Sequence, residues 1–576
     1  MRGQEDVMQD SHARLIEGLP QRSEPDRGRP SNARAVRELV THLPLANPSQ
    51  SARDISDLLE QMLATRWSGG ERVDALEAIR VPVIGLCEGI EQQLGVESHP
   101  MPPAKERLVE TASGFHRALA LNYTLALYEL CAPDGKLPMF KGKAAATAAV
   151  RALHHLGIVL QWCYRLYRTP PAGMWRRAHA LHAFAEDIGV ADKPVADPLP
   201  DGAELDANQA YTHALLLALS NPYRFSPKEL RDAWLLTRAF APHCAPMRHG
   251  GAGIAVDENS DEGPGYVPEE RAIASGGILS LDLASLKRFL EEHAALQPPG
   301  TGHLSFRQRG APGIDASIAF LHRLRSSWTG AAERGFVRVE AGHALDAVIG
   351  LHALHYMLAG NADFGAFMQG LRGGAITLSS REHAAAWTSG TDNTRPQVLS
   401  GHVLDQSLGG YRLQLRADGA LRIRVGEVIG LAPTAEPGDP QDWMAGLIRW
   451  LRTGDDGIYA GVELLARRAR AAGVRLAVGA DDEMHAPQRA VLIPDRSDAA
   501  LPSLLVAHLF DTLASEVEVT TPADPTDWAS RAGVHTYAVA AVEELSATYY
   551  RVSLAETKMA EVAEVVEDKG SDGGES

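Results

Sequence analysis

The sequence predicts a multidomain α plus β protein: a helical N-terminal half (solenoid or bundle-like), a mixed connector, a C-terminal antiparallel β-barrel and a further β extension. Three observations predict this class. The chain has 576 residues, more than a single hydrophobic core organises. Apolar residues at helical spacing dominate up to about residue 245. Short segments of alternating apolar and polar residues, bounded by Gly, Asp and Pro, dominate from about 372 to 556.

The composition excludes several classes of protein. Hydrophobic residues make up 45% of the chain and charged residues 22%, so the whole chain is neither disordered, collagen-like nor a coiled coil. The formal net charge is −17, which repels nucleic acids and anionic bilayers. We therefore expect no nucleic-acid polymer and no membrane insertion among its partners, and any anionic ligand requires a local basic patch.

The sequence favours a cytoplasmic location. Residues 1–30 lack the apolar stretch of a signal peptide, and no run of 18 apolar residues without charge occurs. No CxxC pair indicates a zinc or redox site, and we interpret the cysteines as buried thiols. There are four: Cys87, Cys131, Cys163 and Cys244.

The N-terminal half is predicted to be helical. Residues 1–48 are rich in Arg, Pro, Ser and acidic residues, a composition that predicts a disordered leader. Residues 49–245 are predicted to form an all-α domain, whose first helix carries an apolar stripe from Ile55 to Leu63. Further helices are expected at 71–93, 103–131, 142–167, 173–189, 207–220 and 226–240. Consecutive helices with short connections would offer a docking surface for a protein partner.

The regions on either side of the expected barrel are less regular. Residues 246–371 are predicted to be a mixed α/β connector, with a helix at about 343–359. Residues 471–556 continue the strand pattern and are predicted to form a second β region. Residues 557–576 are acidic and rich in Gly and Ser, which predicts a disordered tail.

The most informative segment runs from 398 to 465, inside the expected barrel at 372–470. Its apolar and polar residues alternate between turn signals, which is typical of a small antiparallel barrel. Asp405, Ser407 and Gly410 stand in it as D-x-S-x-x-G. From the residues alone, this motif is also compatible with a polar hairpin in which Asp and Ser cap their own backbone.

The segment from about 375 to 467 resembles the PilZ domain, a bacterial β-barrel family that binds cyclic di-GMP. The resemblance rests on the D-x-S-x-x-G motif and on the later Val-Gly-Glu, Gly-Leu-Ile-Arg-Trp and Gly-Val-Glu-Leu segments. It implies that Asp405 and Ser407 offer hydrogen-bonding groups to a guanine edge. It also implies that Gly410 lets the backbone turn beside the ligand. The family's role is signalling without catalysis, so no catalytic residue, metal or resident cofactor is expected.

The PilZ family also places an R-x-x-x-R pair just ahead of the barrel, and here the sequence departs from that pattern. Arg381 has Thr377 four positions before it and Ala385 four positions after it, while Arg372 and Arg395 have the wrong spacing. We therefore interpret the segment as a divergent PilZ domain that lacks the complete R-x-x-x-R element. The candidate cyclic di-GMP site consists of Arg381, Asp405, Ser407 and Gly410.

Three functions follow from these observations. The first is a cyclic di-GMP-responsive effector that regulates an unidentified protein partner through its helical region. The second is a degenerate PilZ-like scaffold or adaptor that does not bind nucleotide. The third is a metal-dependent enzyme that uses His343, His352 and His355 on the helix expected at 343–359. No HExxH motif supports the third, and packed histidines explain that pattern more simply.

Overall fold

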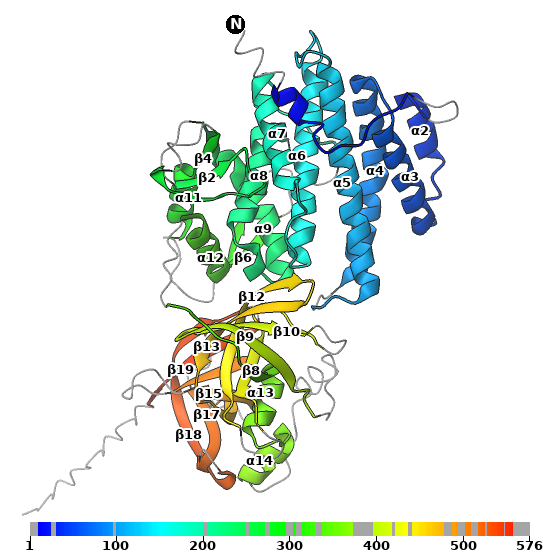
Figure 1. Cartoon of the computed structure of the whole chain (residues 1–576). Coiled ribbons are helices and arrows are strands. Elements are labelled where there is room, and N and C mark those ends of the chain that lie inside the picture. The colour runs from blue at the N-terminus through cyan, green and yellow to red at the C-terminus, as the bar shows by residue number, and fades with distance from the viewer. Residues whose placement is uncertain are drawn as a thin grey trace, which may run out of the picture.

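The computed structural model describes residues 10–24, 30–95, 99–199, 204–248, 253–270, 277–294, 303–306, 313–329, 337–372, 395–416, 421–435, 441–476, 487–493, 502–507, 516–524, 527–546 and 548–556. A row of helices forms one half of the molecule and two β-barrels form the other (Figure 1). This arrangement confirms the predicted fold class. Within these ranges, no helix combines the length and apolar character required to span a bilayer.

The helical half consists of antiparallel helices that lie side by side (Figure 1). Local capping fixes several of their starts. Asn47 caps α3, and complete capping boxes at Asp206 and Ser226 begin α8 and α9. The elements are α2 (Ala33–Thr41), α3 (Pro48–Ala64), α4 (Gly69–Leu94), α5 (Pro103–Cys131), α6 (Gly142–Arg165), α7 (Met174–Asp187), α8 (Ala207–Leu219), η1 (Pro222–Arg224), α9 (Pro227–Phe240) and η2 (Ala241–His243).

Helix α2 lies inside the segment that the composition predicted to be a disordered leader, so that prediction is wrong for residues 33–41. The Asn32 side chain accepts a hydrogen bond from Ala35 N at 2.9 Å and caps the helix. Val36 is fully buried in the helical core. The Ala33 N–H donates to a Glu71 carboxylate oxygen on α4 at 2.9 Å. Packing against α4 stabilises a helix that local composition alone does not reveal.

The first part of the predicted connector belongs to the helical half. Its four-stranded sheet has the order β1-β4-β2-β3. Trp328 is buried, and its Nε1–H donates to Leu216 O on α8 at 3.1 Å. Leu279 belongs to the same core as the helices. The elements are β1 (Ala245–Met247), β2 (Gly253–Asp257), β3 (Gly265–Val267), β4 (Ile278–Asp282), α11 (Ala284–Ala294), β5 (His303–Phe306), β6 (Ile314–Ser317) and α12 (Ile318–Thr329).

The first barrel closes through six strands in the order β8-β9-β10-β13-β12-β11, because β11 pairs with β8. The short strand β7 adds to β9. Leu413, Ile448 and Val403 are among the buried residues that fill the barrel. The elements are β7 (Val339–Glu340), β8 (Ala344–Ile349), α13 (Leu351–Leu358), α14 (Phe364–Arg372), β9 (Leu399–Ser407), β10 (Gly410–Leu415), β11 (Val428–Pro433), β12 (Met444–Gly454) and β13 (Gly457–Ala466).

The barrel thus begins at about residue 339 rather than at 372, and the single helix predicted at 343–359 is wrong in its first half. Residues 344–349 form β8, in which Leu345 and Ala347 are buried while Asp346 is only partly buried. This alternation is the period of a strand. Gly350, with φ of +95°, separates the strand from α13.

The second barrel is also closed, with the order β14-β15-β16-β19-β18-β17, and supplies the predicted further β region. Helix α13 lies between the two barrels. Its His355 Nε2 forms a hydrogen bond with Ala472 O at 3.2 Å. The elements are β14 (Arg470–Leu476), β15 (Gln488–Ile493), β16 (Ser503–Ala507), β17 (Glu516–Asp524), β18 (Asp527–Glu544) and β19 (Tyr549–Glu556). The predicted tail, 557–576, lies outside the described residues.

The helical half contacts the first barrel directly, with β12 next to the ends of the helices (Figure 1). Thr453 donates its backbone N–H to Tyr167 O at 2.8 Å and its hydroxyl to Leu166 O at 3.1 Å. His99 and Ile423 exchange two backbone hydrogen bonds of 3.0 and 2.8 Å. The two halves are therefore joined by main-chain contacts as well as by side chains.

Candidate functional site

The D-x-S-x-x-G residues lie together on the hairpin that joins β9 to β10. Ser407 and Gly410 face each other across a two-residue turn, and the Ser407 hydroxyl donates to Gly410 O at 3.4 Å. Gly410 has φ of +155°, and a Cβ at this position would lie 1.9 Å from Val462 O on β13. Only glycine fits here without strain, so the fold requires Gly410 irrespective of any ligand.

Asp405 is held by two arginines. Arg338 Nη1 lies 2.9 Å from Asp405 Oδ1, and Arg412 Nε lies 3.1 Å from Asp405 Oδ2. The Asp405 side chain is 15% exposed, whereas those of Arg338 and Arg412 are 52% and 45% exposed. Ion pairs at this degree of exposure contribute only about 0–1 kcal/mol to stability. Both guanidinium groups can therefore reorient toward an anion at small energetic cost.

Sequence reasoning missed Arg338, and the reason is the position of the first strand. Arg338 directly precedes β7, and Arg334 stands four positions before it in the sequence, as Arg-Gly-Phe-Val-Arg. The segment just ahead of the barrel therefore has the R-x-x-x-R spacing that the interpretation of a divergent domain took to be missing. Arg334 and the predicted Arg381 both lie outside the described residues. A strand assignment at 344–349 was the signal that would have found this pair.

The histidines considered for a metal site do not share one helix. His343 precedes β8, whereas His352 and His355 lie on α13. Burial lowers the pKa of His355 to about 3 and that of His352 to about 4. Neutral, packed histidines fit this environment. No group of three ligand residues in the described part of the chain includes any of the three.

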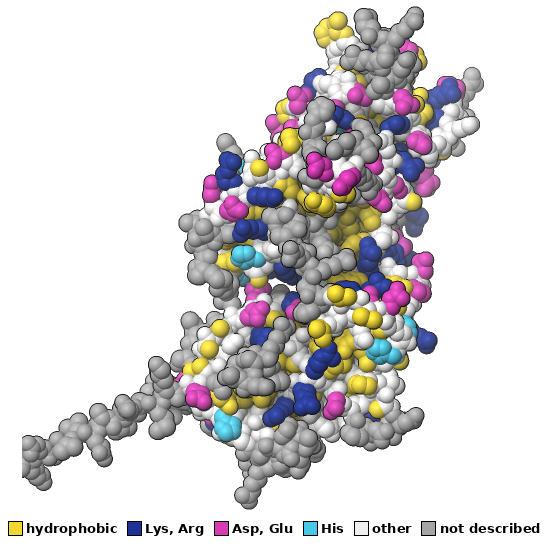
Figure 2. All heavy atoms as spheres, turned by 60° about the vertical axis from the view of Figure 1, so that its left-hand side comes forward, with side chains coloured by type: hydrophobic (Ala, Val, Ile, Leu, Met, Phe, Trp, Pro, Cys, Tyr) yellow, Lys and Arg dark blue, Asp and Glu magenta, His cyan; other side chains and the backbone are white. Residues whose placement is uncertain are grey.

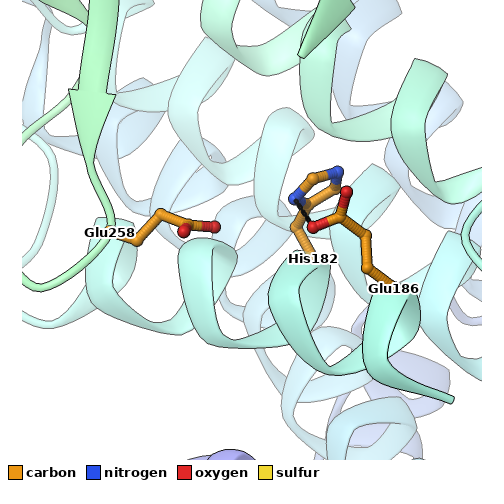
Figure 3. A group of neighbouring side chains, drawn as sticks. All are labelled: His182, Glu186 and Glu258. Atoms are coloured by element: carbon orange, nitrogen blue, oxygen red, sulfur yellow. Dashed lines mark ion pairs between the residues drawn. The ribbon is translucent and has the colours of Figure 1, made fainter. Parts of the chain in front are cut away.

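Another group does gather: His182 and Glu186 on α7 with Glu258 after β2 (Figure 3). Their ligand atoms lie within 4.8 Å of one another. Arg248 Nη1 lies 2.8 Å from Glu258 Oε2, and Arg248 Nη2 also pairs with Glu186. Because Arg248 already supplies positive charge to both carboxylates, we interpret the group as an ion-pair cluster that ties α7 to the small sheet.

The four cysteines carry no disulfide. Burial raises the pKa of Cys87, Cys131 and Cys244 to about 12, and that of Cys163 to about 11. Because the thiolate is the reactive form, these side chains are poor nucleophiles at neutral pH. The interpretation as buried thiols is confirmed for three of them, whereas Cys163 is only partly buried.

Comparisons with known proteins match most of the chain. Residues 34–249 match the family described as "Cyclic-di-GMP receptor FimW, N-terminal domain". Residues 254–397 and 377–471 match "Cyclic-di-GMP receptor FimW, middle PilZ domain". The chain is 24% identical over 522 residues to the cyclic-di-GMP receptor FimW of Pseudomonas aeruginosa, and the alignment covers 82% of this chain and 83% of that receptor.

The middle-domain match includes β7 and β8 as well as the hairpin of Asp405 and Gly410. It therefore agrees with the structure that the domain begins well before residue 372. The resemblance that the D-x-S-x-x-G motif suggested is confirmed. Within residues 254–471, the chain contains a divergent domain of the PilZ family.

Proposed function

We propose that this chain is a cytoplasmic, cyclic di-GMP-responsive PilZ-type effector, which acts by binding and without catalysis. The observation that carries the proposal is the contact of Arg338 with Asp405 beside the Ser407–Gly410 turn. It brings a cation from the segment ahead of the barrel to the motif that the family uses for its ligand. The similarity to a protein named as a cyclic-di-GMP receptor supports the same ligand.

The chemistry of the hairpin suits a cyclic purine dinucleotide. The Asp405 carboxylate accepts hydrogen bonds, as the N–H edge of guanine requires, and the Ser407 hydroxyl donates or accepts. Guanidinium groups pair with phosphodiesters and stack on purine rings. We assign these roles to Arg338 and, from its spacing in the sequence, to Arg334. The role predicted for Arg381 remains a prediction.

Local charge sets the orientation of the ligand. The chain as a whole carries −17, so the phosphodiesters require the arginines beside the hairpin. A phosphate next to Asp405 would be repelled, whereas a guanine edge would be attracted. We therefore place the phosphodiesters toward Arg338 and Arg412 and a base toward Asp405.

The proposed mechanism is a ligand-linked population shift. The barrel that carries the hairpin also contacts the helical half, where Thr453 donates to Tyr167 O. Cyclic di-GMP that binds one arrangement of the two halves more tightly would favour that arrangement. The helical half would then present its surface to a protein partner in a ligand-dependent way.

Calorimetric titration of the full chain with cyclic di-GMP tests the proposal. Saturable binding is expected, and Asp405→Ala should abolish it. Asp456→Ala is the matched control, because Asp456 is an exposed carboxylate at the other end of the same barrel strands, where it accepts from Tyr459 Oη. No saturable heat from the wild-type chain at high micromolar ligand would favour the alternative, a scaffold that has lost nucleotide binding.

A further inference from the structure

A cavity of about 550 Å³ lies where the helical half and both barrels meet. Its walls come from α4, η1, α9 and α12, from the segment that leads into β11, from β12, and from the turn before β19. The molecule narrows between its helical half and its barrels in the view of Figure 2. A volume of this size falls within the range of about 300–1,000 Å³ that is typical of small-molecule sites.

Positive side chains predominate in this cavity. Six arginine and lysine side chains line it, against three glutamates, although the chain as a whole carries −17. The cations come from both halves of the molecule: Arg224, Lys228, Arg231, Arg323, Arg424 and Arg449. A basic cavity in an acidic protein is the local patch that an anionic ligand requires.

The glutamates offset only part of this charge, because two of them pair with arginines of the cavity wall and the third pairs outside it. Glu91 pairs with Arg165 at 3.0 Å, outside the cavity lining. Glu229 accepts from the Ser226 N–H at 2.9 Å in the capping box of α9 and pairs with Arg323 of the cavity wall. Glu427 is buried, accepts a hydrogen bond from the Tyr549 hydroxyl and pairs with Arg424 of the cavity wall at 3.2 Å.

Arg224 has the most unfavourable position among the cations. It is half-buried, and its guanidinium group forms no hydrogen bond or ion pair with any residue in the described ranges. Burial lowers its pKa, and the neighbouring Arg449 and Arg323 lower the pKa further, against a smaller opposing effect of Glu463. Its guanidinium group therefore lies among like charges with its donors unused. An anion in the cavity would relieve both the repulsion and the unmet hydrogen bonding.

We propose that this cavity binds a small phosphate-bearing anion, which bridges the helical half and the first barrel. Arg224 and Arg231 would hold the anion from the helical half, and Arg424, whose side chain is 46% exposed beside Glu427, would hold it from the barrel. Guanidinium groups suit this role because their planar forks match phosphate oxygens. Because like charges from the two halves face each other here, the bound anion would strengthen the contact between the halves.

This site is distinct from the hairpin of Asp405, and the proposal does not depend on cyclic di-GMP binding there. The two sites are nevertheless close in the sheet. Arg449 on β12 pairs with Glu463 on β13, and Glu463 lies opposite Gly410 on β10. An anion that moves Arg449 would therefore act on a strand that is next to the hairpin.

Calorimetric titration of the full chain with inorganic pyrophosphate tests the proposal. We expect saturable binding to the wild-type chain, and Arg224→Glu should weaken it by at least about tenfold, because a charge is reversed within the site. Arg231→Glu, at an exposed position of the cavity wall, should also weaken binding and serves if Arg224→Glu does not fold. Arg288→Glu, at an exposed position on α11, is the matched control and should bind like wild type.

The outcomes separate this site from the hairpin. Pyrophosphate binding that survives Asp405→Ala but is weakened by Arg224→Glu supports the cavity. The proposal is overturned if the wild-type chain shows no saturable binding at millimolar pyrophosphate. Equal loss of affinity in Arg224→Glu and Arg288→Glu also overturns it, as does binding that only Asp405→Ala removes.

A titration with cyclic di-GMP shows whether the phosphate group in the cavity belongs to this dinucleotide or to another compound. Two molecules per wild-type chain, and one per Arg224→Glu chain, would show that the dinucleotide itself also enters the cavity. A single molecule per chain, with pyrophosphate binding unchanged in its presence, would show that the cavity takes a different phosphate compound. If only Asp405→Ala loses cyclic di-GMP binding, that result concerns the hairpin site. The pyrophosphate titration then decides whether the cavity is an anion site.

Discussion

Arg338 Nη1 lies 2.9 Å from Asp405 Oδ1, although the two residues are 67 positions apart in the chain. The pairing of β7 with β9 produces this contact, because Glu340 on β7 lies opposite Asp405. The segment ahead of the barrel is thereby brought to the D-x-S-x-x-G hairpin. Strand pairing thus determines which arginine faces the aspartate, and the spacing of residues in the sequence does not reveal that pairing.

The first prediction compares two arginines. Arg338→Ala should weaken cyclic di-GMP binding by about thirtyfold, or ~2 kcal/mol, because a charge-assisted and stacking contact with the dianion is lost. Arg381→Ala tests the position that the sequence alone predicted, and we expect a smaller effect. Calorimetric titration of both variants measures the difference. The control is Arg467→Ala, at an exposed position between β13 of the first barrel and β14 of the second.

The reverse ranking would decide against our assignment. If Arg381→Ala removed binding and Arg338→Ala bound like wild type, the arginine of the site would be the one predicted from sequence. The contact of Arg338 with Asp405 would then be only a surface ion pair.

The second prediction concerns the turn of the hairpin. Gly410→Ala should destabilise the first barrel by about 2 kcal/mol or more, because the new Cβ would meet the Val462 carbonyl oxygen and the backbone has positive φ. Gly85→Ala, on α4 with open space around its Cα, should instead stabilise by up to about 1 kcal/mol. Urea unfolding followed by tryptophan fluorescence measures both. Equal stability of Gly410→Ala and wild type would contradict the geometry of the turn.

The third prediction is a loss of stability in mild acid. Burial lowers the pKa of His355 and His213 to about 3 and that of His116 to about 4 in the folded state. An unfolded histidine titrates near 6.5. Between these values the unfolded chain binds more protons, so the free energy of unfolding falls as pH drops from about 6.5 toward 4. Each such histidine contributes up to about 1.4 kcal/mol per pH unit in that window.

His355→Gln tests this origin of acid sensitivity. Glutamine does not titrate and retains a donor for the Ala472 carbonyl oxygen, to which His355 bonds between α13 and β14. The variant should therefore lose less stability than wild type between pH 6.5 and 4. His402→Gln, at an exposed position on β9, should follow the wild-type profile. Parallel pH profiles for His355→Gln and wild type would exclude His355 as a source of the effect. Thermal unfolding at stepped pH provides the profiles.

The residues that sequence reasoning found are those that local structure brings together. Asp405, Ser407 and Gly410 are within six positions of one another on a hairpin with a two-residue turn. A motif of that length can be recognised directly in the amino-acid sequence. Helices α3 to α9 were also predictable, because their apolar stripes follow the helical period.

The elements that sequence reasoning missed, β8 and α2, depend on long-range packing. Residues 344–349 contain Ala and Leu and favour a helix locally, but they form β8 because they pair with both β9 and β11. Without that strand, the start of the barrel was misplaced and Arg338 was overlooked. Helix α2 was missed for a similar reason, since Val36 is stabilised by tertiary burial and not by its neighbours in sequence.

The last prediction concerns the contact through which the ligand would act. The Arg452 guanidinium on β12 lies over the Tyr223 ring, 4.6 Å from its centroid, and Tyr223 in turn donates its hydroxyl to Arg168 O at 3.1 Å. A cation–π contact contributes about 0.5–2 kcal/mol. Arg452→Ala should therefore loosen the contact between helical half and barrel, which small-angle X-ray scattering detects as a larger radius of gyration. Arg452 lies at the far end of β12 from the strand positions next to Gly410, so affinity for cyclic di-GMP should change by less than about threefold, or ~0.6 kcal/mol.

An unchanged radius of gyration in the variant would mean that the backbone bonds of Thr453 and His99 are sufficient to hold the halves together. The cation–π contact would then have no part in a ligand-linked shift between arrangements.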